Sequence, residues 1–124
     1  MSFNELELKQ FTGTNHYYSH WTRSLVYTDG IQFLCNNGAA WLVDAIASYQ
    51  SKKQITQDSM LQEYQFWTLR VDLESHKAVL ACERDTNDIV LTQNIDYTDF
   101  PLSGIKLYLV ESGQRKVLML PSEY

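Results

Sequence analysis

The spacing of hydrophobic residues changes at Tyr64, and this change constrains the fold more than any other feature of the sequence. From position 64 to position 73, large apolar residues occupy the odd positions Trp67, Leu69, Val71 and Leu73, and polar residues alternate with them at 68, 70 and 72. A period of two is typical of a β-strand with one face in the core and the other in solvent. We therefore predict that the chain from this point onward forms a sheet.

Five strands are predicted in this second half, separated by polar turns. They cover residues 64–73, 78–83, 89–95, 105–110 and 117–120. Strands that follow one another through short connections usually pair with their sequence neighbours. The pattern therefore predicts an antiparallel meander of about five strands.

The first half of the chain is predicted to be mainly helical, with a short strand or extended link at 24–28. Its clearest helix covers residues 39–50, where one face carries the apolar residues at 100° per residue: Trp41, Leu42, Ala45, Ile46 and Tyr49. Shorter helices are predicted at 3–11, at 14–21 and from Asp29 onward. N-terminal helices packed on one face of the sheet give an α+β fold in a single domain, residues 1–124.

Composition narrows the class of protein further. The chain has 124 residues, of which 13% are aromatic, and this is more large apolar surface than a disordered chain carries. Its formal net charge is −5, and its Lys and Arg residues are scattered along the sequence. We therefore predict no nucleic-acid partner, because binding to phosphates needs clustered cations. No stretch reaches the roughly 18 apolar residues of a membrane span, so no membrane partner is predicted.

The residues at the start of the chain and the cysteines favour a cytoplasmic location. Residues 1–5 lack the cationic and apolar regions of a secretion signal. Cys35 and Cys82 lie in apolar runs, and we predict that both are reduced and buried.

His16 and His20 are the first candidates for chemistry. If residues 14–21 are helical, their spacing of four places both imidazoles on one face, as in helical zinc sites. A third ligand at a familiar spacing is lacking, so the favoured interpretation is packing and solvent exposure, with no metal and no cofactor. The pair remains a weak candidate for metal binding.

Aromatic and charged residues surround these histidines. Tyr17 and Trp21 are candidate pocket residues, and Arg23 and Asp29 follow closely in the sequence. The favoured interpretation of the rings is burial between the helices and the sheet, and a ligand site at these residues is the alternative. No complete catalytic set is found, so catalytic residues are unknown and the prediction leans away from an enzyme.

Several motifs carry a resemblance to a known family. They are Phe11-Thr12-Gly13-Thr14 followed by His16-Tyr17-Tyr18 and His20-Trp21, then Val26-Tyr27-Thr28-Asp29-Gly30, Trp41-Leu42, and the final Leu120-Pro121-Ser122-Glu123-Tyr124. The chain resembles a family of small uncharacterised bacterial proteins over nearly its whole length. The resemblance implies a stand-alone domain whose C-terminal residues are packed, and it brings no activity with it.

Three functional hypotheses follow. The leading one is a non-enzymatic cytosolic module for protein interaction or regulation, as a homodimer or with another protein, because Tyr64 and Phe66 lie on the otherwise polar face of their strand. The alternative is a small enzyme or a ligand- or metal-binding domain centred on His16, His20 and Asp29. An acidic mimic of nucleic acid is less favoured, because acids and bases are interleaved along the chain.

Overall fold

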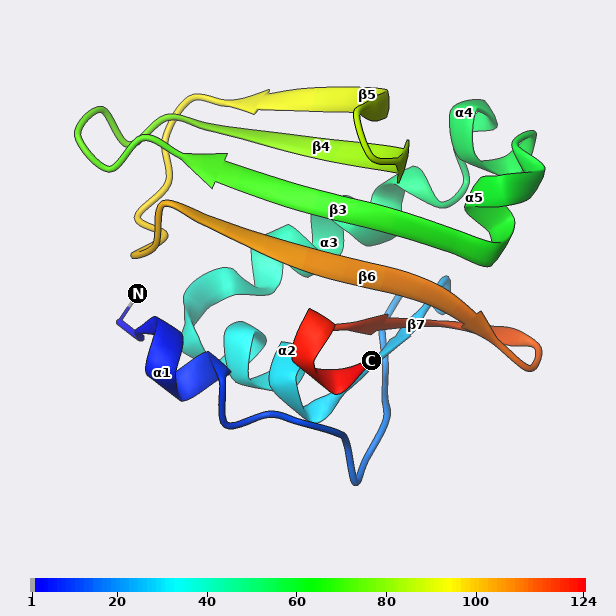
Figure 1. The fold of residues 1–124 in the computed structure, drawn as a ribbon, viewed down its shortest axis with the longest axis horizontal. Helices are drawn as coiled ribbons and strands as arrows, with labels where there is room; N and C mark the ends of the chain where they lie inside the picture. The colour runs from blue at the N-terminus through cyan, green and yellow to red at the C-terminus, as the bar shows by residue number, and fades with distance from the viewer. Residues whose placement is uncertain (1) are drawn as a thin grey trace.

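The computed structural model describes residues 2–124 and combines several helices with a seven-stranded sheet (Figure 1). The strands are β1 (Tyr18–Ser19), β2 (Val26–Tyr27), β3 (Tyr64–Val71), β4 (Ala78–Asp85), β5 (Asp88–Ile95), β6 (Gly104–Ser112) and β7 (Arg115–Met119). The α-helices are α1 (Glu5–Leu8), α2 (Asp29–Leu34), α3 (Ala40–Tyr49), α4 (Lys53–Thr56) and α5 (Ser59–Glu63). A kinked segment, η1 (Cys35–Ala39), joins α2 to α3, and a 3₁₀ turn, η2 (Pro121–Glu123), follows β7.

The sheet has the order β1-β2-β7-β6-β3-β4-β5. The five predicted strands are all present and antiparallel to their neighbours within this order. The predicted simple meander is wrong at one connection, because β6 pairs with β3 and not with β5. The sheet also extends beyond these five strands. The segment predicted at 24–28 as a short strand or extended link contains β2, which pairs in parallel with β7 and carries β1 at its outer edge.

Alternation along β3 gives the sheet two different faces. Gln65, Trp67 and Leu69 are fully or almost fully buried, whereas Tyr64 and Phe66 are only partly buried. The buried face is covered by α3, which passes behind β3 and β6 in Figure 1. The opposite face, which we call the open face, is turned toward the viewer in that figure.

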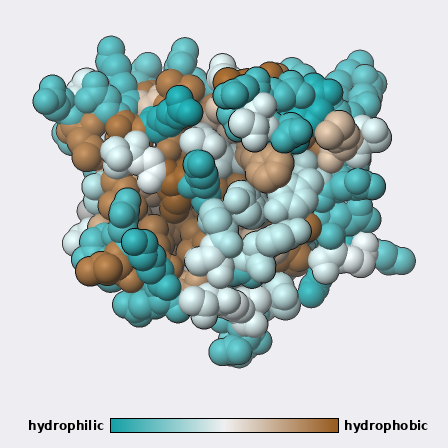
Figure 2. Space-filling model, viewed as in Figure 1, coloured by the Kyte–Doolittle hydropathy of each residue, from teal (hydrophilic) through white to brown (hydrophobic). Residues whose placement is uncertain are grey.

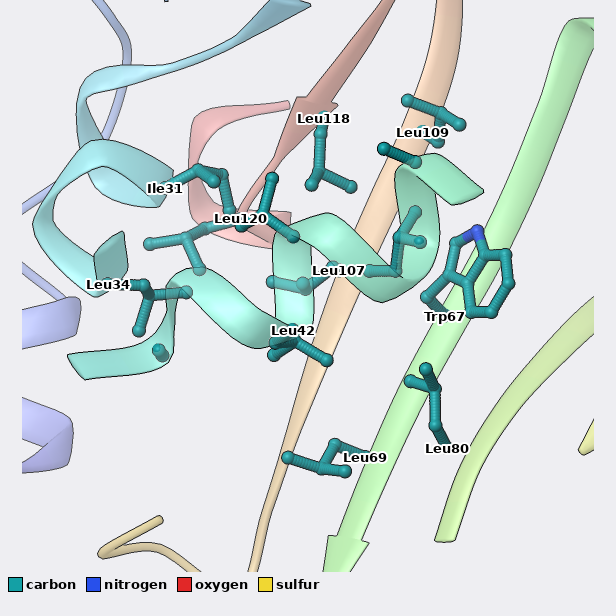
Figure 3. Close-up of a cluster of buried hydrophobic side chains, with 14 of the residues drawn as sticks. Ile31, Leu34, Leu42, Trp67, Leu69, Leu80, Leu107, Leu109, Leu118 and Leu120 are labelled. Atoms are coloured by element: carbon teal, nitrogen blue, oxygen red, sulfur yellow. The ribbon is translucent and has the colours of Figure 1, made fainter. Parts of the chain in front are cut away.

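The core lies between the helices and the buried face of the sheet. Figure 3 shows its centre, where Ile31 and Leu34 of α2 and Leu42 of α3 lie near side chains from four strands. The labelled strand residues are Trp67, Leu69, Leu80, Leu107, Leu109 and Leu118, and all are at most 1% exposed. Because the apolar faces of the helices and sheet meet here, hydrophobic burial holds the two layers together.

The helix predicted at 39–50 is confirmed as α3, whereas the helix predicted at 14–21 is wrong. In the structure this segment is extended, and Tyr18 pairs with Tyr27 across β1 and β2. The two rings stack with centroids 5.6 Å apart. Cross-strand aromatic stacking favours the extended conformation over a helix in this segment.

The other helical predictions are confirmed only approximately. The first helix is α1, much shorter than the predicted 3–11, and its capping box is formed by Asn4 and Glu7. The helix predicted from Asp29 onward is α2, which begins at Asp29 with Thr28 as its N-cap residue. Within residues 2–124, no helix is both long enough and apolar enough to cross a membrane.

Candidate functional site

The N-terminal motifs meet at the start of α2. The backbone N–H of Asp29 donates to Thr14 Oγ1 over 2.9 Å, and the N–H of Asn15 donates to Asp29 Oδ2 over the same distance. These two bonds tie the loop before β1 to the first turn of the helix. The free N–H groups of a helix start need such partners, so the side chain of Thr14 acts as a cap supplied from a distant segment.

Asp29 is the polar centre of this region. Its Oδ1 accepts a hydrogen bond from the hydroxyl of Tyr18 over 3.0 Å and lies 3.7 Å from His16 Nδ1. The hydrogen bond from the Asn15 N–H is the largest cause that lowers the pKa of Asp29, and the Tyr18 hydroxyl adds to it. The same bond to Asp29 raises the pKa of Tyr18. Asp29 therefore stays ionised at neutral pH.

Residues of the C-terminal motif also cap the first turn of α2. Glu123 Oε1 accepts from Thr28 Oγ1 over 2.7 Å and from the Leu120 N–H over 3.0 Å, while Oε2 accepts from the Gly30 N–H over 3.0 Å. Ser122 donates to the carbonyl of Phe11 over 2.6 Å. The expectation that the final motif is packed is confirmed at these residues.

A polar cleft of about 720 Å³ lies beside this junction. Asp29 and Tyr18 line one part of it, and Phe11 and Phe33 provide apolar surface. Gln10, Gln32 and Asn36, which carry amide side chains, and residues 12–15 also line it. A cleft of this size with a few polar groups matches the usual dimensions of small-molecule sites.

His20 belongs to a different cluster from His16. It is 5% exposed, and its Nε2 lies 2.7 Å from Asp44 Oδ1 of α3. Its Nδ1 accepts from the Thr22 N–H over 3.2 Å and lies 2.7 Å from Thr22 Oγ1. Because Nδ1 accepts, the ring proton is on Nε2 and is donated to Asp44. Trp21 donates from Nε1 to the same carboxylate oxygen over 3.1 Å.

The two histidines therefore do not form one site. Residues 16–20 are not helical, and each imidazole faces a different aspartate. Among residues 2–124, no three or more His, Cys, Asp or Glu side chains are close enough to hold a metal ion together. Cys35 and Cys82 are both free thiols in this structure.

Tyr17 and Arg23 lie near β7 rather than beside Asp29 or Asp44. Tyr17 is half exposed, and the guanidinium carbon of Arg115 lies 4.7 Å from the centroid of its ring. Arg23 has a left-handed backbone with φ of 62° and donates its N–H to the His20 carbonyl over 2.8 Å. Of the six predicted ligand residues, the structure thus pairs His16 with Asp29 and His20 with Trp21, while Tyr17 and Arg23 lie at the β7 side.

Four aromatic rings gather on the open face, and we call them the open-face cluster: Tyr64, Phe66, Tyr108 and Tyr124. The centroid of Tyr64 lies 4.7 Å from Phe66, 5.8 Å from Tyr108 and 5.7 Å from Tyr124. In Figure 2, near-neutral and hydrophobic residues occupy much of the middle of this face, and hydrophilic residues are most frequent toward its margin. Burial, together with a hydrogen bond to Tyr124, raises the pKa of Tyr64 to about 12.

Sequence reasoning found only half of this cluster. Alternation on β3 placed Tyr64 and Phe66 on the open face, but Tyr108 and Tyr124 were not identified. Tyr108 is opposite Phe66 in the β3–β6 register, and that register follows from the crossover that the meander prediction missed. Alternation within β6, where Leu107 and Leu109 are buried, is the signal that could have identified Tyr108.

Comparison with known proteins assigns a family. The sequence model of one family covers residues 2–124. The chain belongs to the family of unknown function DUF6876. Neither the comparison with curated proteins nor the comparison with solved structures gave a match. The family assignment agrees with the resemblance seen in the motifs and supplies no activity, so the function is argued from the geometry.

Proposed function

We propose that this protein is a non-enzymatic cytosolic interaction module that binds through the open face of its sheet. The observation that carries the proposal is the open-face cluster. Tyr64, Phe66 and Tyr108 are partly buried and Tyr124 is 71% exposed, so the four neighbouring rings present a partly exposed aromatic surface on this face. Tyrosine and phenylalanine supply much of the binding energy at protein interfaces.

The polar residues of the N-terminal motifs support this proposal indirectly. Asp29 accepts bonds from its own loop, and His20 is held between Asp44 and Thr22. These groups link segments of the fold, which is a structural use of residue types that often serve catalysis. A module of this kind needs a surface rather than a reactive group.

We further propose that the partner is a second copy of the chain. Lys106 of β6 lies opposite Thr68 on one side of β3, and Glu83 of β4 lies opposite Phe66 on the other side. Directly paired residues share a face of the sheet, so both charges flank the open-face cluster. A two-fold axis along β3 exchanges the two sides of that strand. Glu83 of the second copy then lies over Tyr108, two residues along β6 from Lys106. The long lysine side chain can bridge this spacing, so the surface is complementary to itself.

Sedimentation velocity over a range of protein concentrations tests the proposal. We expect the unmodified protein to form a dimer, and we expect Lys106→Glu and Glu83→Lys each to weaken it by placing like charges together. The double variant Lys106→Glu/Glu83→Lys restores the opposite-charge pairs and should restore the dimer. Lys53→Glu on α4 is the matched control for Lys106→Glu, because it changes the net charge by the same amount at a residue outside the sheet.

Each result of the sedimentation experiment either supports or overturns the proposed homodimer. Recovery in the double variant supports the self-complementary open face. A monomer at every soluble concentration overturns the homodimer, and a dimer that is insensitive to both single substitutions overturns this face as its interface. Tyr124→Ser adds a test of the aromatic contribution, because this exposed residue at the end of the chain can be changed with little effect on the core.

A second candidate function is small-molecule binding in the cleft beside Asp29. The observation that favours it is the cleft of about 720 Å³ next to an ionised carboxylate. A ligand there would be small, polar and cationic, and it would contact Asp29 and Tyr18 rather than His20. A thermal-shift screen of small amines tests this function. Stabilisation that is lost in Asp29→Asn supports it, and the absence of any shift overturns it.

A further inference from the structure

An apolar groove of about 470 Å³ lies where α1, η2 and the start of β6 meet. Its apolar lining residues are Leu8, Leu102, Ile105, Leu120 and Pro121. In Figure 2, hydrophobic residues are visible in the region that lies between α1 and β6 in Figure 1. Ile105 is only partly buried, whereas Leu107 and Leu109 on the same face of β6 are each 1% exposed. The cover over this face of the sheet is therefore incomplete at the groove.

The hydrogen bonds of β6 show which way its backbone groups point beside the groove. The N–H of Val71 donates to the carbonyl of Ser103 over 2.8 Å, and the β3–β6 register places these two residues opposite each other. In an antiparallel pair, residues that bond to the partner strand alternate with residues whose N–H and C=O point away from it. Ile105 therefore bonds to β3, whereas the backbone groups of Gly104 and Lys106 point to the other side of β6.

The neighbouring strand β7 does not reach these groups. It ends at Met119, which is opposite Tyr108 of β6. If β7 continued in the same register, Pro121 would lie opposite Lys106, and proline has no N–H to donate. The chain instead turns away into η2, with Pro121 at its first position. Within residues 2–124, no hydrogen bond from outside the β3–β6 ladder reaches the backbone of Gly104 or Lys106, so β6 has a short free edge along the groove.

An extended polypeptide fits both the free edge and the groove. The N–H and C=O groups at a sheet edge are the groups to which an added strand bonds. In a strand antiparallel to β6, as β7 is, the residues opposite Gly104 and Lys106 would exchange backbone hydrogen bonds with them. The residue between these two would be opposite Ile105 and would point to the same face, into the groove. A ligand without a peptide backbone would leave the edge groups unused.

The charged residues of the groove favour an acidic segment. Lys9 and Lys106 are both exposed, and they line the groove together with one carboxylate, that of Glu5. Their sum of about +1 has the opposite sign to the net charge of the whole chain, which is −5. A positive rim on an acidic protein attracts acidic partners and repels further copies of the chain.

We propose that this edge of β6 binds an extended segment of another protein, in which an apolar residue is flanked by acidic residues. The segment pairs antiparallel with Gly104 and Lys106 and places its apolar side chain in the groove. This interaction goes beyond the proposed homodimer, because it uses a strand edge and a groove beside α1 rather than the open-face cluster.

Hydrogen exchange followed by ¹⁵N NMR tests the free edge before any ligand is added. We expect the N–H groups of Gly104 and Lys106 to exchange at least about tenfold faster than those of Ile105 and Leu107, which bond to β3. Slow exchange at Gly104 and Lys106 in the monomeric protein would show that the edge is already paired, and it would overturn the proposal.

Titration with an acetylated and amidated pentapeptide, Ser-Glu-Ile-Glu-Ser, tests the pairing. We expect the N–H signals of Gly104 and Lys106 to shift and their exchange to slow. N-methylation of either glutamate removes an N–H that bonds to β6, and it should weaken binding at least about tenfold. N-methylation of the isoleucine is the matched control, because its N–H points away from β6 and its loss should have a much smaller effect.

Two substitutions in the protein test the groove and its rim. Leu102→Glu places a carboxylate in the apolar groove and should weaken binding of the peptide at least about tenfold. Lys9→Glu reverses an exposed charge and should weaken binding about two- to fivefold. Lys53→Glu on α4 is the matched control, because it makes the same change in net charge outside the groove and should leave binding unchanged.

Four other outcomes overturn the proposal. The absence of any shift at Gly104 and Lys106 up to about 10 mM peptide means that the edge does not bind such a segment. Equal effects of N-methylation at the isoleucine and the glutamates exclude strand pairing. Shifts that follow protein concentration without peptide assign the edge to a second copy. Binding of sodium decanoate without binding of the peptide assigns the groove to an acyl chain.

The rest of the ¹⁵N spectrum verifies that each variant is folded. Sedimentation of Leu102→Glu and Lys9→Glu separates these results from the proposed homodimer, because neither residue belongs to the open-face cluster or to the charges that flank it. A homodimer that persists while peptide binding is lost supports two independent surfaces.

Discussion

The hydroxyl of Thr28 donates a 2.7 Å hydrogen bond to the carboxylate of Glu123, which lies 95 residues later in the chain. The same carboxylate accepts from the Gly30 N–H, so the last turn of the chain caps the first turn of α2. Gly30 permits this approach because it has no side chain. A Cβ built there would lie 2.5 Å from Glu123 Oε1 and 2.6 Å from Leu120 Cδ1.

Gly30→Ala should therefore destabilise the protein. The added methyl group must displace Glu123 and Leu120, and overpacking of this kind costs about 1–3 kcal/mol. Urea unfolding followed by circular dichroism measures the change. Gly13→Ala is the matched control, because a Cβ at that position meets nothing within 4 Å, and its effect should stay within about 0.5 kcal/mol. Equal stability of the two variants would contradict the capping role of Glu123.

The two histidines of the N-terminal motif should respond differently to substitution. His20→Ala removes a buried ring and leaves Asp44 and Thr22 without their shared partner, so we expect a loss of about 2–4 kcal/mol in the free energy of unfolding. The side chain of His16 is 73% exposed, and His16→Ala should cost less than about 0.5 kcal/mol. Similar losses in both variants would show that the part-buried His20–Asp44 contact is not a main source of stability.

Much of the sheet could be predicted because alternation is a local signal. The run from Trp67 to Val71 alternates between the core and the open face whatever its neighbours are, and the structure confirms this pattern. Strand order is not local. Pairing of β6 with β3 depends on how the whole chain packs, and nothing in the turns around residues 96–103 indicates a crossover.

The segment around Tyr18 could not be predicted for a related reason. Its spacing of polar and aromatic residues fits a short helix, but its extended form depends on partners far away in the sequence. Thr14 and Asn15 bond to Asp29, and Tyr18 stacks on Tyr27. Tertiary contacts of this kind override weak helix propensity. The alternative of two imidazoles on one face failed with the helix on which it depended, whereas the favoured interpretation of one packed and one exposed imidazole fits His20 and His16.

The thiols should be unreactive while the protein is folded. Burial is the main cause that raises the pKa of Cys35 to about 11 and that of Cys82 to about 12. The reactive thiolate is therefore scarce at pH 8, and Cys82 is also fully buried. We expect a disulfide reagent such as DTNB to label neither cysteine quickly in native buffer and both in denaturant. Fast labelling of Cys82 in the native protein would contradict the packing of β4 against the core.

Asp29 should make the stability of the protein depend on pH in the acid range. The Asn15 N–H, followed by the Tyr18 hydroxyl, holds its pKa below the ordinary value of 3.8. A carboxyl group with a lowered pKa in the folded state contributes stability that is present above its unfolded pKa and is lost as the pH falls through its folded pKa. The advantage of the unmodified protein over Asp29→Asn should therefore be constant near neutral pH and shrink below about pH 4.

Urea unfolding of both proteins between neutral and acid pH measures this difference, and a ¹³C NMR titration of the Asp29 carboxyl measures its pKa directly. Asparagine keeps the shape of the side chain and an oxygen that can accept from the Asn15 N–H, while it removes the charge and the oxygen that accepts from the Tyr18 hydroxyl. A carboxyl that titrates at or above 3.8 would mean that the loop of residues 14–18 is not pinned to α2 in solution. The polar cleft beside Asp29 would then lose the wall on which its proposed ligand depends.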